Sequence, residues 1–359
     1  MKTGIFFRFP RTREKQDRKF VCIYFHSRLK ILMKILFITS TRIGDAVLST
    51  GLLDYMARTY PQGKVTVACG PLPSSLFEGF PNVEAVWAMK KEKRSGHWVK
   101  LWKRAVRTRW DIVVDLRNSA VSRMLWAKKR YIFGPKIDKS LHKVEQAAQV
   151  MKLESIPAPK LYFTPEQERF ADALMNGEGP ILGVGPSANW IGKTWPAENF
   201  IEVIAWMTGK GGPMEGARVA VFAAPGEEAQ ARPVLESIPE DKRIDGIAKG
   251  SPGEVAACLN RCAFYLGNDS GLMHIAAACG VKTVGVYGPS YPHLYRPWGD
   301  HTAYARTPET FDELIDFEGY DPKTLDRTLM TTLKTQDVID IISRLWSDGI
   351  SIKDTAQGN

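Results

Sequence analysis

The sequence lacks any apolar run long enough to cross a membrane as a helix, which takes about 18 residues or more. Its most apolar stretch, "FVCIYFHSRLKILMKILFI" at residues 20–38, is interrupted by a histidine, an arginine and two lysines. The composition, 44% hydrophobic and 25% charged, is that of a globular chain. We therefore expect a soluble protein, and a length of 359 residues favours two domains.

Cysteine is scarce, and the spacing of the five cysteines excludes the common cysteine-based sites. No CxxC pair and no cluster of His and Cys is present, which argues against a zinc site or a disulfide framework. No group of carboxylates or histidines has metal-ligand spacing either, so we expect no metal and no cofactor. The dinucleotide-binding pattern GxGxxG is also missing. The sequence thus predicts reduced thiols in a cytoplasmic protein.

Positive charge is concentrated at the start of the chain. Residues 1–32 contain nine Lys or Arg against two acidic residues, a net charge of +7, which leaves +3 of the total of +10 for the remainder. This stretch lacks the long apolar core and the small-residue cleavage site of a secretory signal. It could be a basic arm that touches a membrane. We favour an upstream translation start, with residues 1–32 outside the fold and the working protein beginning at Met33.

From Met33 onward, short apolar runs alternate with helical patterns, which indicates an α/β fold with doubly wound parallel sheets. The stretch "SIPAPKLYFTP", around residues 154–165, interrupts this pattern with three prolines and predicts a linker. We expect Rossmann-like domains at 33–160 and 161–334 and a closing helix at 335–349. The strands are expected at 34–38, 65–68, 83–88, 111–116, 181–186, 217–225, 263–268 and 283–289; a first helix at 45–60; and irregular structure at 297–325.

The segment "GNDSGLMHIAAACGVKTVGVYGP" (267–289) predicts an anion site after a strand. Free backbone N–H groups at a helix start, together with the helix dipole, attract negative charge. Asp269 or Ser270 could cap the helix, Gly271 would let a ligand approach the backbone, and His274 could donate a hydrogen bond. The alternative is an ordinary capped helix with a satisfied histidine.

Two further loops strengthen the prediction of a site. "GPSANWIGKTWPAENF" (185–200) follows another strand and places Ser187, Asn189 and Lys193 at its carboxyl end, so Lys193 should lie beside the helix start at 270. In the first half, "TRIGD" places Gly44 and Asp45 at a helix start. Asp45 is either a carboxylate that faces the interdomain cleft or a plain N-cap.

The stretch "KKEKRSGHWVKLWKRAVRTRW" (90–110) combines nine Lys or Arg with three tryptophans at helical spacing. Such a helix suits anionic lipid headgroups or a phosphorylated glycolipid. A nucleic-acid groove has a similar composition, and a solvated helix that packs through its Trp side is the plainest reading. Because the stretch lies in the first domain, we favour a membrane-facing role among the functional readings.

In combination, these motifs resemble glycosyltransferase family 9, the ADP-heptose:lipopolysaccharide heptosyltransferases. "GNDSGLMHIAAACGVKTVGVYGP", "RIGDAVLSTGLL", "GKTWPAENF" and "VVDLRNSAVS" are similar to family segments in order and spacing over about residues 33–345. The resemblance implies a GT-B fold, in which two Rossmann-like domains face each other across a cleft. The first domain would bind the acceptor and the second the nucleotide sugar, and the transfer would be inverting and independent of metal.

The resemblance also assigns roles to residues. It implies that Asp45 is the general base and that Lys193 contacts the donor phosphates. Either Glu227 or Glu228 would lie near the donor ribose, and acids in a first helical turn also suit the helix dipole. The remaining donor-side positions are Ser187, Asn189, Asp269, Ser270, Gly271 and His274, and the acceptor-side positions are Arg42, Gly44, Arg117 and Ser119.

The function expected from this resemblance is transfer of a heptose from ADP-heptose to a lipopolysaccharide inner-core or related glycolipid acceptor. The partners would be a nucleotide sugar and an anionic glycolipid at the membrane surface, without nucleic acid. The protein would be cytoplasmic, and peripheral association with the cytoplasmic face of the inner membrane is open. Alternatives are another nucleotide-sugar transferase, a GT-B epimerase, or a non-catalytic protein that binds partners through its basic patch.

Overall fold

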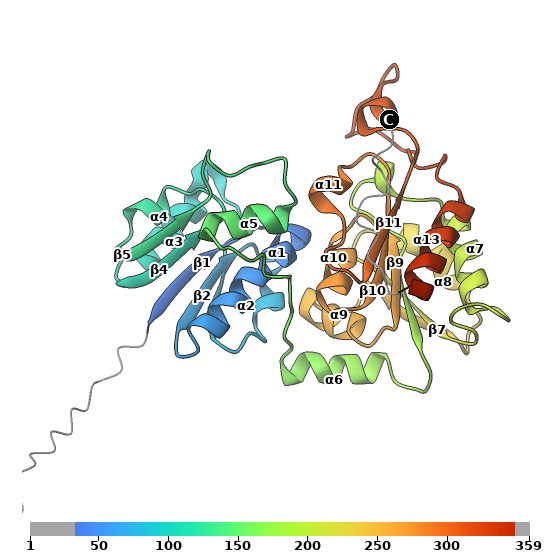
Figure 1. Ribbon diagram of the computed structural model, residues 1–359, viewed down its shortest axis with the longest axis horizontal. Helices are drawn as coiled ribbons and strands as arrows, with labels where there is room; N and C mark the ends of the chain where they lie inside the picture. The colour runs from blue at the N-terminus through green and yellow to red at the C-terminus, as the bar shows by residue number, and fades with distance from the viewer. Residues whose placement is uncertain (1–32, 349–359) are drawn as a thin grey trace, which may run out of the picture. The chain divides into compact units, whose positions relative to one another are not determined.

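Two parallel β-sheets form the scaffold of the computed structural model, which describes residues 33–348 (Figure 1). The first sheet has the order β3-β2-β1-β4-β5 and the second the order β11-β10-β9-β6-β7-β8. Every strand pair is parallel, which confirms the predicted α/β class. The strands are β1 (Lys34–Ile38), β2 (Lys64–Cys69), β3 (Val83–Ala88), β4 (Trp110–Asp115), β5 (Ala127–Ile132), β6 (Ile181–Gly185), β7 (Arg218–Ala223), β8 (Arg243–Ile247), β9 (Phe264–Asn268), β10 (Lys282–Tyr287) and β11 (Thr302–Arg306).

Helices connect the strands, as parallel pairing requires. We call β1 to α5 the N-lobe and α6 to α13 the C-lobe. The α-helices are α1 (Ile43–Leu48), α2 (Thr50–Thr59), α3 (Gly96–Ala105), α4 (Val121–Met124), α5 (Lys143–Met151), α6 (Pro165–Leu174), α7 (Ala197–Thr208), α8 (Glu228–Glu236), α9 (Pro252–Leu259), α10 (Gly271–Ala278), α11 (Pro292–Tyr295), α12 (Phe311–Ile315) and α13 (Thr335–Asp348), with short 3₁₀ helices η1 (Ser74–Phe77), η2 (Lys93–Ser95) and η3 (Ile191–Lys193).

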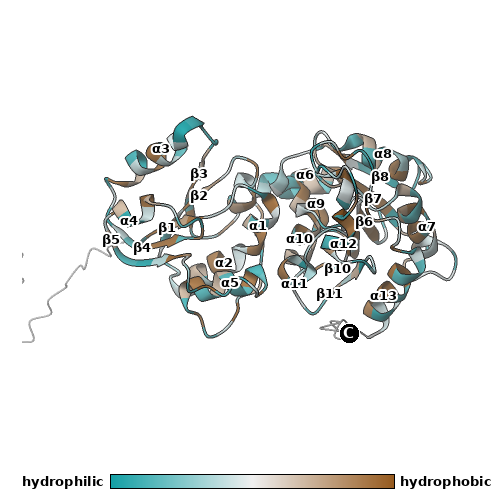
Figure 2. Cartoon of the chain, turned by 90° about the horizontal axis from the view of Figure 1, so that it is seen from above, coloured by the Kyte–Doolittle hydropathy of each residue, from teal (hydrophilic) through white to brown (hydrophobic). Residues whose placement is uncertain are grey.

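The central strands are buried because apolar side chains occupy both of their faces. β1 (KILFI) and β6 (ILGVG) pair with a neighbour on each side, and apart from Lys34 all of their residues are buried. This is the sequence signature of a strand covered by helices on both faces. Figure 2 shows the central strands in hydrophobic colours and the edge strand β5 (AKKRYI) in hydrophilic ones. A continuous apolar run therefore marks the middle of each sheet.

The sequence analysis missed three strands. β5 was not predicted because it is basic, and β8 (RIDGI) was not predicted because a charge and a glycine interrupt it. β11 lies within 297–325, where irregular structure was expected, and α12 also lies there, so that expectation is wrong. β5, β8 and β11 are all edge strands, which need not be apolar on both faces.

The helix expected at 45–60 begins earlier and is divided in two. α1 begins at Ile43, and Ser49 separates it from α2. The Ser49 hydroxyl donates to the carbonyl oxygen of Ala46 at 2.7 Å and contacts the Thr39 hydroxyl at 2.8 Å. A serine that binds its own preceding turn competes with the regular helical hydrogen bonds. The start of α1 is consequently a short, separate element.

Residues 152–164 connect the lobes without a helix or strand, and this segment is anchored to the N-lobe. The Lys160 N–H donates to Thr50 Oγ1 at 3.1 Å, and the Tyr162 hydroxyl donates to Asp54 Oδ1 at 2.6 Å. Residues 33–348 belong to a single unit. Its lobes are further tied together by the Gly253 N–H, which donates to Ser75 Oγ at 2.9 Å.

Two expectations concern residues that the structure does not cover. The basic extension 1–32 and the last residue of the predicted closing helix, Gly349, lie outside the described residues. In residues 33–348, no helix is both long enough and apolar enough to span a membrane.

Candidate functional site

The start of α10 carries the predicted anion site at the carboxyl end of β9. Ser270 occupies the N-cap position in an extended conformation, but no side chain accepts a hydrogen bond from the first turn. Of the two predicted capping residues, Ser270 thus takes the N-cap position, but its side chain makes no capping hydrogen bond. Asp269 instead forms an ion pair, and the buried Ser270 hydroxyl interacts with the Tyr265 hydroxyl. Among residues 33–348, no side chain accepts a hydrogen bond from the N–H groups of the first turn.

His274 lies one turn into α10 and is nearly fully buried, with 4% of its surface exposed. Its Nδ1 atom has no partner within residues 33–348, so the alternative of a satisfied histidine does not describe this side chain. Burial lowers the pKa of His274, while the nearby carboxylates of Asp269 and Asp45 act in the opposite direction. A neutral imidazole with a free ring nitrogen can either donate to or accept from a ligand.

Lys193 reaches the α10 start, as the sequence predicted. Its Nζ atom lies 2.6 Å from Asp269 Oδ2, and the two side chains are 26% and 8% exposed. The loop that carries Lys193 is fixed on several sides: the N–H of Trp195 donates to Asn268 Oδ1 at 3.0 Å, and the N–H of Ala188 donates to Gln230 Oε1 at 3.0 Å. The ammonium group is therefore held in place at the carboxyl edge of the second sheet.

The structure distinguishes the two glutamates between which the sequence could not choose. Glu227 accepts a 2.7 Å hydrogen bond from the hydroxyl of the fully buried Ser187, at the carboxyl end of β6. Glu228 instead accepts from the N–H of Gly226 in its own loop, and hydrogen bonds from its own N–H and from that of Gly226 lower its pKa. Glu227 thus contacts the end of β6, whereas Glu228 contacts its own loop. Asn189 is exposed on the loop after Ser187.

Two further buried polar atoms, Asn268 Nδ2 and Ser290 Oγ, lack a partner near this edge among residues 33–348, and the sequence analysis did not identify them. The Tyr265 hydroxyl, which interacts with the Ser270 side chain, also reaches the edge. Gly185 and Gly267 leave room for it, because a Cβ at these glycines would lie 2.0 Å and 2.5 Å from the hydroxyl oxygen. Buried polar atoms are nearly always hydrogen-bonded in native structures. A gathering of unpaired ones at one edge therefore marks a place for a polar ligand.

Asp45 lies in the first turn of α1, two residues after the helix begins. The N-cap position is occupied by Arg42, so the reading of Asp45 as a plain N-cap is wrong. The hydroxyl of Ser40 donates to Asp45 Oδ2 at 3.4 Å and accepts from the Arg42 N–H at 3.2 Å and from Arg117 Nη1 at 3.4 Å. Ser40, which no motif indicated, thus links Asp45 to two of the predicted acceptor-side residues.

The other acceptor-side positions have different surroundings. Ser119 is buried, and both its N–H and its hydroxyl donate to Asp115 Oδ2, at 2.8 Å and 2.7 Å. These bonds fix the loop after β4, which carries Arg117, so the contacts of Ser119 are within this loop. Arg42 and Arg117 are exposed. Both guanidinium groups are therefore open to an anionic acceptor on the same side as Asp45.

The starts of α1 and α10 lie directly against each other, which brings the two halves of the predicted site together. A Cβ at Gly44 would lie 2.9 Å from Cδ2 of His274, and a Cβ at Gly271 would lie 2.8 Å from Cγ2 of Ile43. Only glycine permits such an approach. Tyr295, which the sequence did not indicate, also lies here: burial raises its pKa, and the charges of Asp45 and Asp269 add to that effect.

No group of three or more His, Cys, Asp or Glu side chains in residues 33–348 is arranged to hold a metal ion. The cysteines of this range, Cys69, Cys258, Cys262 and Cys279, are free thiols. What the arrangement offers is a cation, free backbone N–H groups and an imidazole on one side, and a carboxylate on the other.

The sequence profile of glycosyltransferase family 9 (heptosyltransferase) matches residues 130–317, which is more than half of the chain. Lipooligosaccharide heptosyltransferase 2 of Haemophilus influenzae is 24% identical over 312 residues, covering 76% of this chain and 88% of that protein. Lipopolysaccharide heptosyltransferase 2 of Salmonella typhimurium is 26% identical over 307 residues, covering 74% and 85%.

Solved structures agree with this similarity. A family 9 glycosyltransferase from Veillonella parvula has a TM-score of 0.70 at 21% identity, with coverage of 88% of this chain and 97% of that one. ADP-heptose lipopolysaccharide heptosyltransferase II of Escherichia coli has a TM-score of 0.66 at 21% identity, covering 88% and 98%. The likeness confirms the expected GT-B fold class.

Proposed function

Because the chain belongs to glycosyltransferase family 9, the heptosyltransferases, we propose that it transfers a heptose from ADP-heptose to a lipopolysaccharide inner-core or related glycolipid acceptor. The transfer inverts the anomeric configuration and needs neither a metal ion nor another cofactor. The observation that carries the proposal is the contact between the starts of α1 and α10, where Gly44 lies against the ring of His274. This contact supports the proposal because it brings the Asp45 carboxylate near His274, on the side of the site where we propose that the diphosphate binds.

The C-lobe would hold the leaving group. When the bond from the anomeric carbon to the diphosphate oxygen breaks, the electron pair stays on the diphosphate, whose negative charge needs stabilisation. Lys193 and the free N–H groups of the α10 start provide it without a metal. Asp269 holds Lys193 at the edge, and His274 can donate a hydrogen bond to a phosphate oxygen. Glu227, fixed by Ser187, can accept from a ribose hydroxyl.

The N-lobe would supply the attacking group. In an inverting transfer the acceptor hydroxyl approaches the anomeric carbon from the face opposite the diphosphate, so its base must come from the other side of the site. Asp45 meets this requirement. Its carboxylate takes the hydroxyl proton as the new bond from oxygen to carbon forms, and Ser40 keeps the carboxylate oriented. Arg42 and Arg117 can pair with anionic groups of the acceptor.

The site of action follows from the acceptor. A glycolipid with acidic groups is presented at a membrane surface, so the proposal places the enzyme in the cytoplasm with access to the cytoplasmic face of the inner membrane. The relatives named above carry the words lipooligosaccharide and lipopolysaccharide in their names, which supports this class of acceptor.

Donor and acceptor can be tested together. The purified protein is incubated with a heptose-deficient core glycolipid and, in separate reactions, with ADP-heptose, ADP-glucose, UDP-glucose or GDP-mannose. Mass spectrometry should show addition of one heptose with ADP-heptose alone, and NMR of the product should show the inverted anomeric configuration. Transfer from a UDP or GDP sugar, or a retained configuration, would contradict the proposal.

A further inference from the structure

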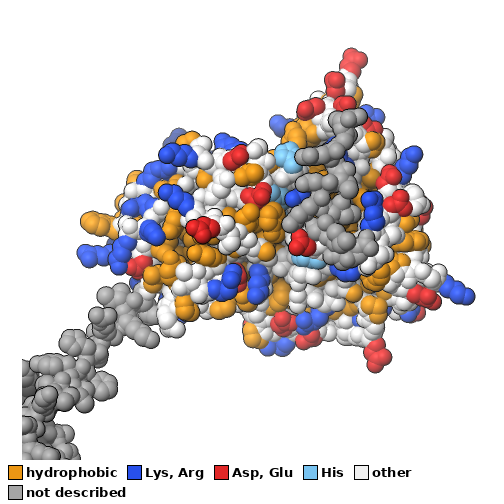
Figure 3. Space-filling view, in the orientation of Figure 1, with side chains coloured by type: hydrophobic (Ala, Val, Ile, Leu, Met, Phe, Trp, Pro, Cys, Tyr) orange, Lys and Arg blue, Asp and Glu red, His pale blue; other side chains and the backbone are white. Residues whose placement is uncertain are grey.

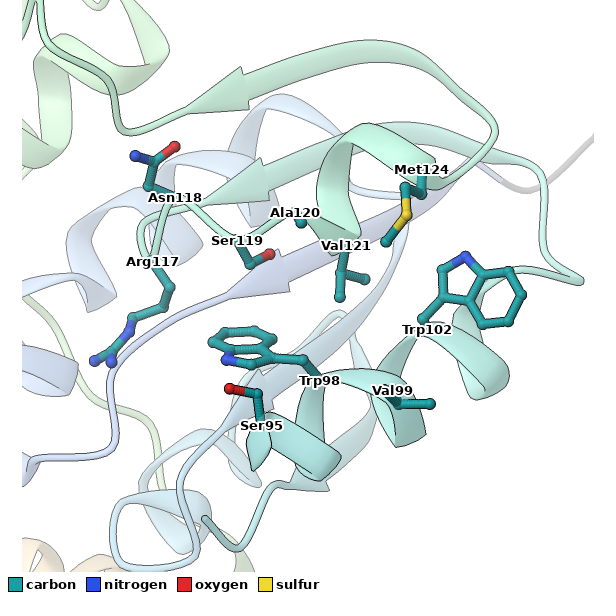
Figure 4. Close-up of a pocket in the computed structure, with 10 residues that line it drawn as sticks. All are labelled: Ser95, Trp98, Val99, Trp102, Arg117, Asn118, Ser119, Ala120, Val121 and Met124. Atoms are coloured by element: carbon teal, nitrogen blue, oxygen red, sulfur yellow. The ribbon is translucent and has the colours of Figure 1, made fainter. Parts of the chain in front are cut away.

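The N-lobe has a groove between α3 and α4, and apart from Arg117 and Ser119 its lining residues have no role in the proposed reaction. Its volume is about 590 Å³ (Figure 4). Trp98 and Trp102 of α3 and Val121 and Met124 of α4 face this space, whereas Arg117 lies on the loop at its other end. The groove is therefore apolar along the helices and polar where it approaches the Ser40–Asp45 contact.

The surface around the groove exposes large apolar side chains. Val99, Met124 and Trp126 are 52%, 56% and 71% exposed, and they are three of the six large hydrophobic residues that are exposed in residues 33–348. Val99 is on α3, Met124 ends α4, and Trp126 follows it directly before β5. A cluster of exposed apolar side chains marks an interaction surface more often than scattered ones do.

The same surface is strongly positive. Residues 90–136 contain 15 Lys or Arg against 3 Asp or Glu, a net charge of +12, whereas residues 33–359 together carry only +3. Figure 3 shows blue side chains around hydrophobic ones at the edge of the molecule where Figure 1 labels α4 and β5. Some of these charges are neutralised, for example Lys128 by Asp111 at 2.7 Å. Lys103 and Arg107 have no carboxylate partner among the described residues.

We propose that this surface, formed by α3, α4 and the start of β5, docks on the surface of an anionic lipid bilayer, with Val99, Met124 and Trp126 entering the interface. A bilayer surface offers negative headgroups above an apolar layer, which matches a positive rim around exposed apolar side chains. A nucleic acid would match the charge, but its charged backbone offers no apolar layer in which the side chains of Val99 and Met124 could be buried. A second copy of this chain would be repelled by the like charge.

Val99, Met124 and Trp126 do not belong to the proposed catalytic site, so docking can occur without the transfer reaction. Docking would, however, fix the position of the acceptor side of that site relative to the bilayer. Arg117 lines the polar end of the groove and also contacts Ser40, which holds Asp45. A docked enzyme would therefore have the acceptor side of its site close to the bilayer, within reach of a substrate that cannot leave it.

Co-sedimentation of the full-length protein with lipid vesicles tests the docking. One set of vesicles is phosphatidylcholine alone, and the other contains one third phosphatidylglycerol. The apolar variant is M124S/W126S, and the charge variant is K103E/R107E. Matched controls on other surfaces are Ile156→Ser, which removes a side chain that is 43% exposed, and K210E/K334E. The basic residues 1–32 are present in every protein, so differences between variants report on the groove surface.

The wild type should bind the anionic vesicles and release them at high salt. Removing the apolar pair should weaken binding about tenfold. Loss of the two positive charges should by itself weaken binding about 25-fold, and the two added negative charges of K103E/R107E should weaken it further. Both control proteins should bind like the wild type, and every variant should unfold in urea at the concentration at which the wild type unfolds, which verifies folding. Two outcomes would overturn the proposal: groove variants that bind vesicles within twofold of the wild type, or a wild type that prefers single-stranded DNA to anionic vesicles.

Discussion

Removal of the Lys193 side chain is the sharpest test of the proposed donor site. In the free protein, Lys193 Nζ lies 2.6 Å from Asp269 Oδ2. An ammonium group has three hydrogens, so this contact leaves two for the diphosphate of a bound donor. Lys193→Ala therefore removes the cation, and it also leaves the Asp269 carboxylate facing the phosphates with no positive charge between them. Attraction is lost and repulsion is added.

The expected magnitude follows from these contacts. A hydrogen bond to a charged group contributes roughly 1.5–3 kcal/mol, which corresponds to about a 10- to 150-fold weaker affinity for ADP when it is lost. Since Asp269 is only 8% exposed, its unpaired carboxylate should also lower the free energy of unfolding by about 1–2 kcal/mol. The double variant K193A/D269N removes the buried charge, so it should regain part of both losses.

Isothermal titration calorimetry with ADP measures the affinity, and urea unfolding measures the stability. The matched control is Lys249→Ala, because Lys249 forms an ion pair of 3.2 Å with Asp245 in the same lobe, with both side chains more exposed. This control should change neither quantity appreciably. If Lys193→Ala binds ADP within twofold of the wild type, Lys193 does not contact the diphosphate and the assignment of the donor edge is wrong.

Three other predictions concern the base, metal and acid stability. Asp45→Asn should lower turnover about 10²- to 10⁴-fold while calorimetry shows unchanged ADP affinity; near-normal turnover would exclude Asp45 as the base. EDTA should leave activity in a steady-state assay intact, and a strict requirement for Mg²⁺ would refute the metal-free mechanism. Burial lowers the pKa of His142 from 6.5 to about 4, so the unfolded chain binds this proton more readily than the folded one. The free energy of unfolding should therefore fall as the pH drops below 6.5, by about 2 kcal/mol at pH 5. Protonation would place a hydrogen on Nδ1, which accepts from the Val144 N–H at 3.3 Å. His142→Asn should flatten this pH dependence in urea unfolding; an unchanged slope would show that other groups cause it.

The central strands and the motifs at their ends were predictable from local sequence. Apolar runs such as KILFI specify strands that are covered on both faces, and the residue types of "NDSG" and "RIGD" indicate polar corners after them. Basic or interrupted edge strands such as β5 and β8 carry no such pattern, because one side of an edge strand is not paired within the sheet. Their existence depends on the neighbouring strand and not on their own composition.

Other features were decided by contacts between residues far apart in the chain. The separation of Glu227 from Glu228 depends on Ser187, which is 40 residues away, and the pairing of Lys193 with Asp269 spans 76 residues. Tyr295 lies in no motif, and only the packing of the chain brings it near Asp45, which is 250 residues away.

The sequence by itself determined the parallel α/β class, the residue ranges of the central strands and the polar corners, because each depends on residues close together in the chain. The tertiary structure decided which of those corners meet. The contact of Gly44 with His274 joins segments 230 residues apart. No local pattern encodes such a contact, because its geometry depends on how the two lobes pack against each other. They meet through α1, which follows β1 of the first sheet, and α10, which follows β9 of the second.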